Sequence, residues 1–263
     1  MRLLHLHWSH LLFRLLRDGT PGTPAASLPS GPIVLGGRPW EDRVVLDADP
    51  AATALGIRRG MALGTAHRLV PEATFLEPGS DAAREAVEAA LERLAELSPG
   101  IAGTSDPAAP AFGLLELQLD GLERLWGPEE RVVALARDRT APHLPGPARA
   151  GIAGTRFAAR VAAALAPSGG LRAVAPGEEP GFLAPLPARI LTDDREVRAR
   201  LARFGLRRVA EIADLPRSAL MARFGEEGVR MHARARGEET EPFRPRRGLE
   251  RLALPLPLEP GEE

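Results

Sequence analysis

The segment 111–127 constrains the fold more than any other part of the chain, because its side chains alternate between apolar and polar. The apolar positions are Leu115, Leu117 and Leu119, and the polar positions between and after them are Glu116, Gln118 and Asp120. A period of two with one apolar face predicts a half-buried β-strand. Gly121 ends the alternation. The pattern therefore predicts a sheet with one covered face, and it places the carboxylates of Glu116 and Asp120 in solvent.

Composition excludes several kinds of chemistry. The 263 residues include no cysteine, which removes disulfides, thiolate catalysis and cysteine-bound zinc. A hydrophobic fraction of 44% and this length allow a buried core in one domain or in two to three small ones. Every lysine-or-arginine position is arginine, and the net charge is -1. Binding to nucleic acid must therefore come from local arginine patches, not from the overall charge.

Predicted strands and helices alternate along the first two thirds of the chain, which indicates an α/β (α+β) protein. The predicted strands are 3–8, 33–37, 43–46, 149–154 and 171–175, and the predicted helices are 9–17, 80–97, 129–139 and 155–167. Ser80 precedes the longest of these helices as a cap, and Ser98-Pro99 stops it. Segment 18–32 is rich in Gly, Pro, Ser and Thr and predicts a loop.

The last third of the chain predicts helices separated by glycine turns. Segment 197–216 reads as helix, turn and helix, and segment 220–237 follows as a second run that ends in a basic helix. Backbone N–H groups at such a turn can meet a DNA phosphate without reading sequence. The candidate DNA-binding residues are Arg203, Gly205, Leu206, Arg207, Arg208, Arg223, Gly225 and Gly228. Plain helix packing with arginines in solvent is the alternative.

Three histidines near the N-terminus, His5, His7 and His10, raise the alternative of a zinc site. A structural zinc site needs four ligands, and no fourth is nearby, so surface or partly buried imidazoles are the favoured interpretation. The same histidines, with Arg14 and Arg17, interrupt the leucine-rich start of the chain. A membrane span and a secretory signal are therefore not expected, and we predict a cytoplasmic protein.

Taken in order, these segments resemble the Y-family (UmuC/DinB-like) translesion DNA polymerases over about residues 1–240. The resemblance rests on the strand and turn of 111–127, on Gly56-Ile-Arg-Arg-Gly-Met61, on Gly151-Ile-Ala-Gly-Thr-Arg156 and on the glycine turns that follow. It implies a palm from 1–12 and 74–166, fingers from 13–73 and a helix-hairpin-helix thumb from 167–240. A Pro-rich tail or linker, 241–263, follows, and the chain ends too soon for the family's little finger.

The resemblance implies a site without its usual chemistry. The family's metal-binding carboxylates fall on His7, Gly113 and Leu114, and none of these can bind a cation. Arg160 falls where the family places a lysine that contacts the triphosphate. The branch with the greatest likeness is the ImuB-like one, so we expect a pseudo-polymerase that is not an enzyme. It would need no metal and no cofactor and would be a DNA-binding adaptor in DNA repair and translesion synthesis during SOS mutagenesis.

The partners implied by the resemblance are DNA, bound non-specifically through its backbone, and three proteins of a mutagenic assembly: an error-prone replicative-type polymerase, a RecA-like protein and the sliding clamp. No membrane is implied. Two alternatives stay open. One is an active nucleotidyltransferase that binds Mg²⁺ through displaced acids such as Asp47, Asp49 or Asp106. The other is a protein-interaction module whose helical turns no longer meet DNA.

Overall fold

The computed structural model describes residues 1–19 and 28–246. The predicted tail 241–263 therefore lies outside the described residues from 247 onward. Within the described residues, none of the helices combines the length and the apolar composition needed to cross a membrane.

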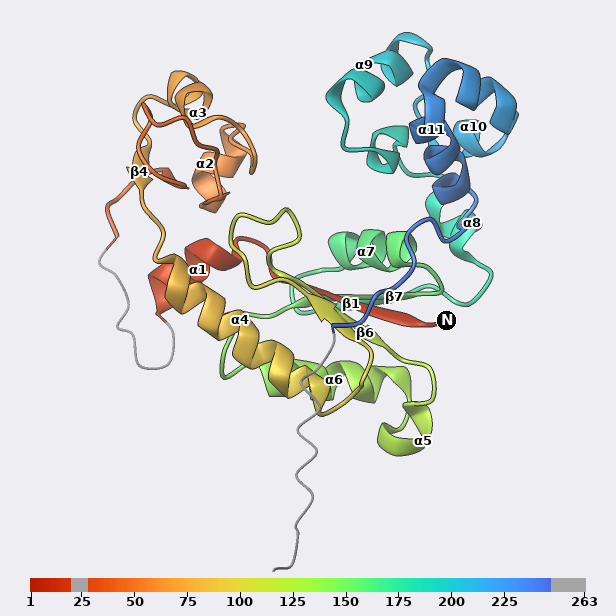
Figure 1. The fold of residues 1–263 in the computed structure, drawn as a ribbon, viewed down its shortest axis with the longest axis horizontal. Helices are drawn as coiled ribbons and strands as arrows, with labels where there is room; N and C mark the ends of the chain where they lie inside the picture. The colour runs from red at the N-terminus through yellow and green to blue at the C-terminus, as the bar shows by residue number, and fades with distance from the viewer. Residues whose placement is uncertain (20–27, 247–263) are drawn as a thin grey trace, which may run out of the picture.

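A mixed sheet of five strands, called the main sheet, lies at the centre of the molecule (Figure 1). Its spatial order is β5 (Ile101–Gly103), β6 (Leu114–Gln118), β1 (Leu3–His7), β7 (Arg149–Ala153) and β8 (Leu171–Ala173). The N-terminal strand β1 occupies the middle position and pairs antiparallel with both β6 and β7. Strand β8 is parallel to β7, as expected when a helix connects two neighbouring strands.

The alternation in segment 111–127 is confirmed by the packing of β6. Leu115, Leu117 and Leu119 are buried in one apolar cluster with the inward side chains of α4 (Ser80–Ala95) and α6 (Glu129–Thr140). The short helices α1 (Leu11–Asp18) and α5 (Glu123–Trp126) lie beside this layer. Helix α7 (Arg156–Leu165) packs on β7 and β1 and forms a second cluster with Leu3. The main sheet thus carries helices on both faces, and α7 belongs to the face that holds the polar side chains of β6.

Strand β7 and helix α7 approach each other closely at Gly151. A Cβ built on Gly151 would lie 2.2 Å from the carbonyl oxygen of Ala159 and 2.2 Å from the amide nitrogen of Ala163. No side chain fits into that space. The buried side of α7 is rich in alanine for the same reason, because at this short distance between helix and sheet there is room for no side chain larger than a methyl group.

A second, smaller sheet lies at the left in Figure 1, with the order β3 (Asp47–Ala48), β2 (Ile33–Leu35) and β4 (Thr74–Leu76). It has its own apolar core, which includes Val34, Ile57 and Leu63 and is covered by α2 (Pro50–Ala54) and α3 (Leu63–Leu69). Strand β4 pairs with β2, so the small sheet extends past residue 73. Helix α1, in contrast, buries Leu12 and Phe13 in the core of the main sheet.

The remaining helices form a helical unit, residues 179–235, at the right in Figure 1. It contains α8 (Glu179–Leu183), the 3₁₀ turn η1 (Ala188–Leu191), α9 (Arg195–Arg203), α10 (Val209–Ala213) and α11 (Arg217–Ala235). Helix α11 is two helices joined at a kink, because Gly225 has φ 62° and ψ -147°. The chain then returns to the main sheet through residues 237–246, which we call the strap.

We predict that Gly151→Ala destabilises the fold by about 1–3 kcal/mol or more, because the methyl group overpacks the contact between β7 and α7. Chemical denaturation followed by circular dichroism measures this change. Gly181→Ala is the matched control, since a Cβ at Gly181 meets no atom within 4 Å. Equal stabilities for the two variants would contradict the steric account.

Candidate functional site

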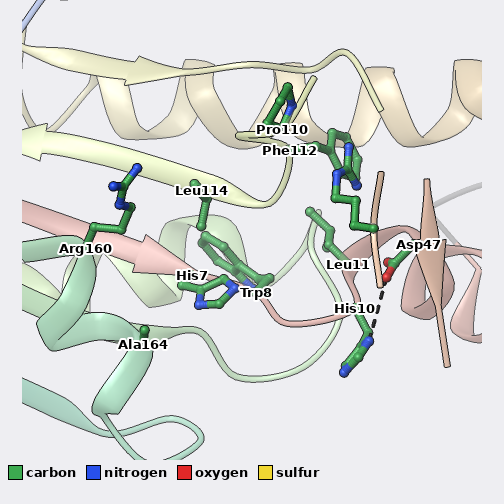
Figure 2. Close-up of a pocket in the computed structure, with 11 residues that line it drawn as sticks. His7, Trp8, His10, Leu11, Asp47, Pro110, Phe112, Leu114, Arg160 and Ala164 are labelled. Atoms are coloured by element: carbon green, nitrogen blue, oxygen red, sulfur yellow. Dashed lines mark ion pairs between the residues drawn. The ribbon is translucent and has the colours of Figure 1, made fainter. Parts of the chain in front are cut away.

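A pocket lies where the end of β1 and the start of β6 face the small sheet (Figure 2). Its volume is about 270 Å³. The lining residues are His7, Trp8, His10, Leu11, Asp47, Arg59, Pro110, Phe112, Leu114, Arg160 and Ala164. The pocket thus combines two guanidinium groups, two imidazoles, two large aromatic rings and, among the described lining residues, a single carboxylate.

The three positions predicted to correspond to metal-binding acids do come together at this pocket. His7 ends β1 and is the register partner of Leu114, the first residue of β6. The amide of Trp8 donates a 2.9 Å hydrogen bond to the carbonyl oxygen of Gly113. Gly113 has φ 85°, which the turn before β6 requires and a residue with a side chain adopts only under strain. The backbone therefore brings these positions together, and their side chains supply an imidazole, a hydrogen and an isobutyl group.

Burial determines the electrostatic state of His7. Its burial, followed by the positive charges of His5, Arg149 and His10, lowers the pKa of His7 to about 4. The imidazole is therefore neutral near pH 7. His10 behaves in the opposite way, because a hydrogen bond with Asp47 raises its pKa despite partial burial. His10 also adopts left-handed backbone angles, φ 56° and ψ 40°, at the start of α1.

Asp47 is the carboxylate of the pocket, and structural contacts already engage it. One oxygen accepts a 2.8 Å hydrogen bond from the amide of Ala48, and the other accepts a 3.2 Å bond from the amide of Phe13 in the first turn of α1. The Nδ1 atom of His10 lies 3.7 Å from the carboxylate and 2.7 Å from the carbonyl oxygen of Ala48. Asp47 therefore ties the small sheet to α1 while it faces the pocket.

The other two acids considered as displaced ligands lie outside the pocket lining. Asp49 caps α2, accepting from the amides of Ala52 and Ile33, and is buried. Asp106 accepts from the amide of Ala108 in an exposed turn. No group of three or more His, Asp or Glu side chains with the spacing of a metal site occurs in the part of the chain that the structure describes.

Arg59 and Arg160 give the pocket its positive charge. The guanidinium of Arg59 donates to the carbonyl oxygens of Pro107, Ala109 and Leu46, so it joins the small sheet to the turn before β6. Arg160 projects from α7 with its guanidinium 5.7 Å from the ring centre of Phe157. Within residues 1–19 and 28–246, Arg160 has no ion pair with a carboxylate. The predicted phosphate-binding role of Arg160 remains a proposal, and its position at the pocket is compatible with it.

The prediction that Glu116 lies in solvent is wrong. Its side chain is buried, and its two oxygens accept from the Nε and Nη2 atoms of Arg156, with Nη2 at 2.6 Å. The Nδ1 atom of buried His5, its partner across the strands, lies 3.3 Å from the carboxylate. Burial opposes ionisation of Glu116, but the contacts with His5 and Arg156 outweigh it and lower its pKa to about 2. Glu116 thus holds the start of α7 against β6 and is not a solvent-facing group.

The helical unit contains an internal repeat that the sequence prediction missed. Segments 202–209 and 222–229 both begin Ala-Arg-Phe-Gly and both end in Val, at a spacing of 20 residues. The glycines, Gly205 and Gly225, have φ 72° and 62°, and a Cβ on either would meet no atom within 4 Å. The rings of Phe204 and Phe224 contact each other edge to face, with their centres 6.0 Å apart. The repeat therefore produces two adjacent turns with open glycine backbones.

The two turns differ in charge and in available donors. At the first turn, Glu211 accepts hydrogen bonds from the backbone N–H groups of Arg207 and Arg208, at 2.6 and 3.2 Å. A phosphate there would meet guanidinium groups, not the amides that the sequence argument invoked. At the second turn, Glu226 and Glu227 follow the glycine, and Gly228 is buried where a Cβ would lie 2.3 Å from the carbonyl oxygen of Leu220. Close packing against Leu220 therefore accounts for a glycine at position 228. The prediction that Gly228 contacts DNA did not take this packing into account.

The helical unit exposes many arginines that make no ion pair with a carboxylate of the described residues. They are Arg189, Arg195, Arg203, Arg207, Arg208, Arg217 and Arg223. Arg203, Arg207 and Arg208 surround the first turn, and Arg223 comes directly before Phe224. Arg223 lies over the ring of Phe204 at 5.6 Å, and Arg200 lies over that of Phe224 at 4.8 Å. The first turn is thus the more basic of the two.

Comparison with known proteins identifies relatives. The model of a family described as impB/mucB/samB matches residues 23–164, more than half of the chain. DNA polymerase IV of Dehalococcoides mccartyi (strain CBDB1) is 31% identical over 214 residues, which are 80% of this chain and 53% of that protein. Protein ImuB of Caulobacter vibrioides (strain NA1000 / CB15N) is 32% identical over 213 residues, 80% of this chain and 44% of that protein. The chain thus spans about half the length of these curated relatives.

Solved structures agree on the fold. DinB from Sulfolobus solfataricus superposes with a TM-score of 0.72 at 17% identity, covering 92% of this chain and 69% of that one. The structure of an insertion ternary complex of Dbh DNA polymerase superposes with a TM-score of 0.68 at 18% identity. The match covers 92% of this chain and 69% of that one. These matches confirm the predicted fold class, a Y-family-like palm with small fingers and a helix-hairpin-helix thumb. We propose that the main sheet, the small sheet and the helical unit are these three parts, in that order.

The relatives contradict the prediction that the chain is not an enzyme. Several are named DNA polymerase IV, and the superposed structures are of Y-family polymerases, which points to polymerase activity, although an ImuB protein is also a relative. The prediction rested on the missing carboxylates at positions 7, 113 and 114, and it named Asp47 only in the alternative of an active enzyme. The structure places the carboxylate of Asp47 in the same pocket.

We predict that His7→Gln flattens the pH dependence of stability between about pH 4 and 6.5. The unfolded chain binds a proton on His7 below pH 6.5, whereas the folded chain does so only below about pH 4. Stability from this group is therefore present above pH 6.5 and is lost as the pH falls toward 4. Denaturation midpoints measured from pH 4 to 8 test this. The curves should run parallel above pH 6.5, and an unchanged slope below it would refute the assignment.

Proposed function

Because the chain belongs to the impB/mucB/samB family, within the Y-family of DNA polymerases, we propose that it is a DNA-binding adaptor in translesion synthesis. It holds primer–template DNA between its palm, fingers and thumb. The observation that carries this proposal is the set of exposed arginines around the first thumb turn, which make no ion pair with a carboxylate of the described residues. Arginine stays charged at all working pH values and forks onto phosphate oxygens, so such a surface binds a DNA backbone without reading its sequence.

The proposed division of the chain follows the predicted one with adjustments at its boundaries. Strand β8 pairs with β7 in the main sheet, so we place residues 171–173 with the palm and begin the thumb at residue 179. Helix α1 packs in the palm core, so we place it with the palm. Strand β4 pairs with β2, so we place residues 74–76 with the fingers. The thumb extends through residue 235, and the strap returns to the palm. The likeness to an ImuB protein extends the proposal to an assembly with an error-prone polymerase, a RecA-like protein and the sliding clamp.

We predict that Arg207→Ala/Arg208→Ala weakens binding of a fluorescent primer–template roughly tenfold or more at low salt. The plot of log affinity against log salt should lose about 2 units of slope, because each phosphate contact contributes about 0.9. Fluorescence anisotropy across a salt series measures both quantities. Arg124→Ala/Arg131→Ala removes the same charge from α5 and α6, on the face of the main sheet opposite α7, and is the matched control.

A control variant that weakens binding as much as the turn variant would assign the effect to overall charge. An absence of binding by the unchanged protein would overturn the adaptor proposal and favour a protein-interaction module.

Nucleotidyl transfer in the pocket is the second candidate function, and two observations favour it. Relatives carry the name DNA polymerase IV, and Asp47 presents a carboxylate between Arg59 and the end of β1. Carboxylates hold Mg²⁺ against a triphosphate in phosphoryl transfer, and arginines neutralise the developing charge. Here Asp47 would hold the metal, and Arg160 would contact the phosphates. The DNA-holding role above is compatible with this chemistry.

For this second function we predict Mg²⁺-dependent primer extension that Asp47→Asn abolishes and Asp106→Asn leaves intact. Both variants exchange one carboxylate for an amide of equal size, but only Asp47 lines the pocket. Extension of a labelled primer, resolved on a gel, measures the activity, and the melting curve of each variant verifies folding. A lack of extension by the unchanged protein with every dNTP would rule out nucleotidyl transfer by this chain.

A further inference from the structure

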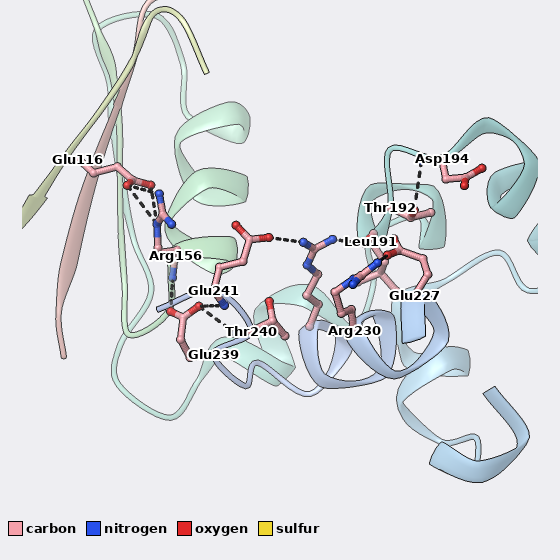
Figure 3. Close-up of polar contacts among 11 residues, drawn as sticks. Glu116, Arg156, Leu191, Thr192, Asp194, Glu227, Arg230, Glu239, Thr240 and Glu241 are labelled. Carbon is pink, nitrogen blue, oxygen red and sulfur yellow. Dashed lines mark hydrogen bonds and ion pairs between the residues drawn. The ribbon is translucent and has the colours of Figure 1, made fainter. Parts of the chain in front are cut away.

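The structure assigns to Arg234, Phe157 and the strap a latch that fixes the orientation of the thumb against the palm. Arg234 lies near the end of α11, the last thumb helix, and Phe157 lies in the first turn of α7, on the palm. The strap, residues 237–246, connects the two regions and carries Glu239 and Glu241 (Figure 3). The latch deepens the proposed function and rests on it for its purpose, because a fixed thumb matters when DNA is held between palm, fingers and thumb.

Arg234 is the centre of the latch. Its Nη1 atom donates a 2.7 Å hydrogen bond to the carbonyl oxygen of Leu191, in the thumb, and its Nη2 atom pairs with Glu241 of the strap at 2.5 Å. Its guanidinium lies 5.4 Å from the ring centre of Phe157. The side chain of Arg234 is only 12% exposed, whereas that of Glu241 is 50% exposed, so the contacts with Leu191 and Phe157 are less screened by solvent than the ion pair. One side chain therefore joins thumb, strap and palm.

The strap is anchored on the palm at several points. Glu239 accepts from the backbone N–H of Arg156 at the start of α7, and the side chain of Arg156 is itself held by buried Glu116. Farther along, the amide of Arg246 donates a 2.7 Å hydrogen bond to the carbonyl oxygen of Ile101, on the edge strand β5, and its side chain pairs with Glu88. The strap thus crosses from the thumb to the far edge of the main sheet.

The turn into the strap has a steric requirement. Gly237 has φ 69°, and a Cβ there would lie 2.7 Å from the Cβ of Glu179 in α8. Glu179 is buried and accepts hydrogen bonds from the amides of Gly154, at the end of β7, and Gly177. The chain therefore enters and leaves the thumb at one point, and the apolar cluster that contains Leu3, Phe157 and Met231 continues beneath it. Arg234 lies at the edge of this junction and sets its angle.

The absence of cysteine makes a direct test simple. Glu92→Cys on α4 and Ser218→Cys on α11 place the only two thiols of the 263-residue chain on exposed positions of palm and thumb. Spin labels on both report the distribution of palm–thumb distances, measured on the whole chain without DNA. Arg234→Ala and, separately, Phe157→Leu should broaden the distribution and raise the population of displaced thumbs roughly tenfold. Arg236→Ala is the matched control, because Arg236 is 53% exposed and pairs only with Glu238 in the described chain.

A DNA measurement separates the latch from direct contact. Arg234→Ala should weaken primer–template binding severalfold with an unchanged salt slope, since no phosphate contact is lost. Arg207→Ala/Arg208→Ala should change the slope and leave the distance distribution as it is. If Arg234→Ala does not fold, Glu241→Gln and Phe157→Leu keep the test intact.

Identical distance distributions for Arg234→Ala, Phe157→Leu and the parent would overturn the latch, whatever the DNA result. A broadened distribution in a protein that binds no DNA would support the latch and refute the adaptor proposal, so the two failures are distinguishable.

Discussion

The pairing of β1 with both β6 and β7 is the interaction on which the rest of the structure depends. It makes the N-terminal strand the centre of the main sheet, with Leu4 and Leu6 toward α4 and α6, and with Leu3 and the histidines toward the opposite face. It places His7 beside Leu114, which fixes where the pocket opens. It also places His5 beside Glu116, and that carboxylate holds Arg156 and, through it, the start of α7.

Arginine performs three different tasks in this chain. One task is structural: hydrogen bonds that join separate elements of the fold engage the guanidinium groups of Arg59, Arg156 and Arg234. Arg160 faces the pocket without a carboxylate partner among the described residues. The arginines of the first thumb turn are exposed, and Glu211 occupies the backbone donors beside them. Counting arginines in the sequence cannot separate these tasks, because each depends on which carboxylates and carbonyl oxygens the fold brings near.

The sequence predicts what depends on local order and misses what depends on distant segments. The alternation around Leu117 predicted β6, and the turn at Gly205 predicted a helical hairpin, because strand and turn patterns are local. The burial of Glu116 could not be predicted, since its partner Arg156 is 40 residues away. Asp47 was named as an acid, but its place in the pocket follows from the packing of the small sheet on α1. The repeat of Ala-Arg-Phe-Gly, in contrast, was readable from the sequence and shows that internal comparison of short segments is informative.

The exclusive use of arginine on the thumb surface has a consequence for regulation. Cells commonly weaken the grip of a protein on DNA by acetylating lysine, which removes a positive charge. The surface around Arg207 and Arg208 offers no such target, because the sequence contains no lysine. Its charge is also insensitive to pH, since guanidinium groups do not lose their proton in proteins. Neither lysine acetylation nor a change of pH can therefore remove the charge of this surface.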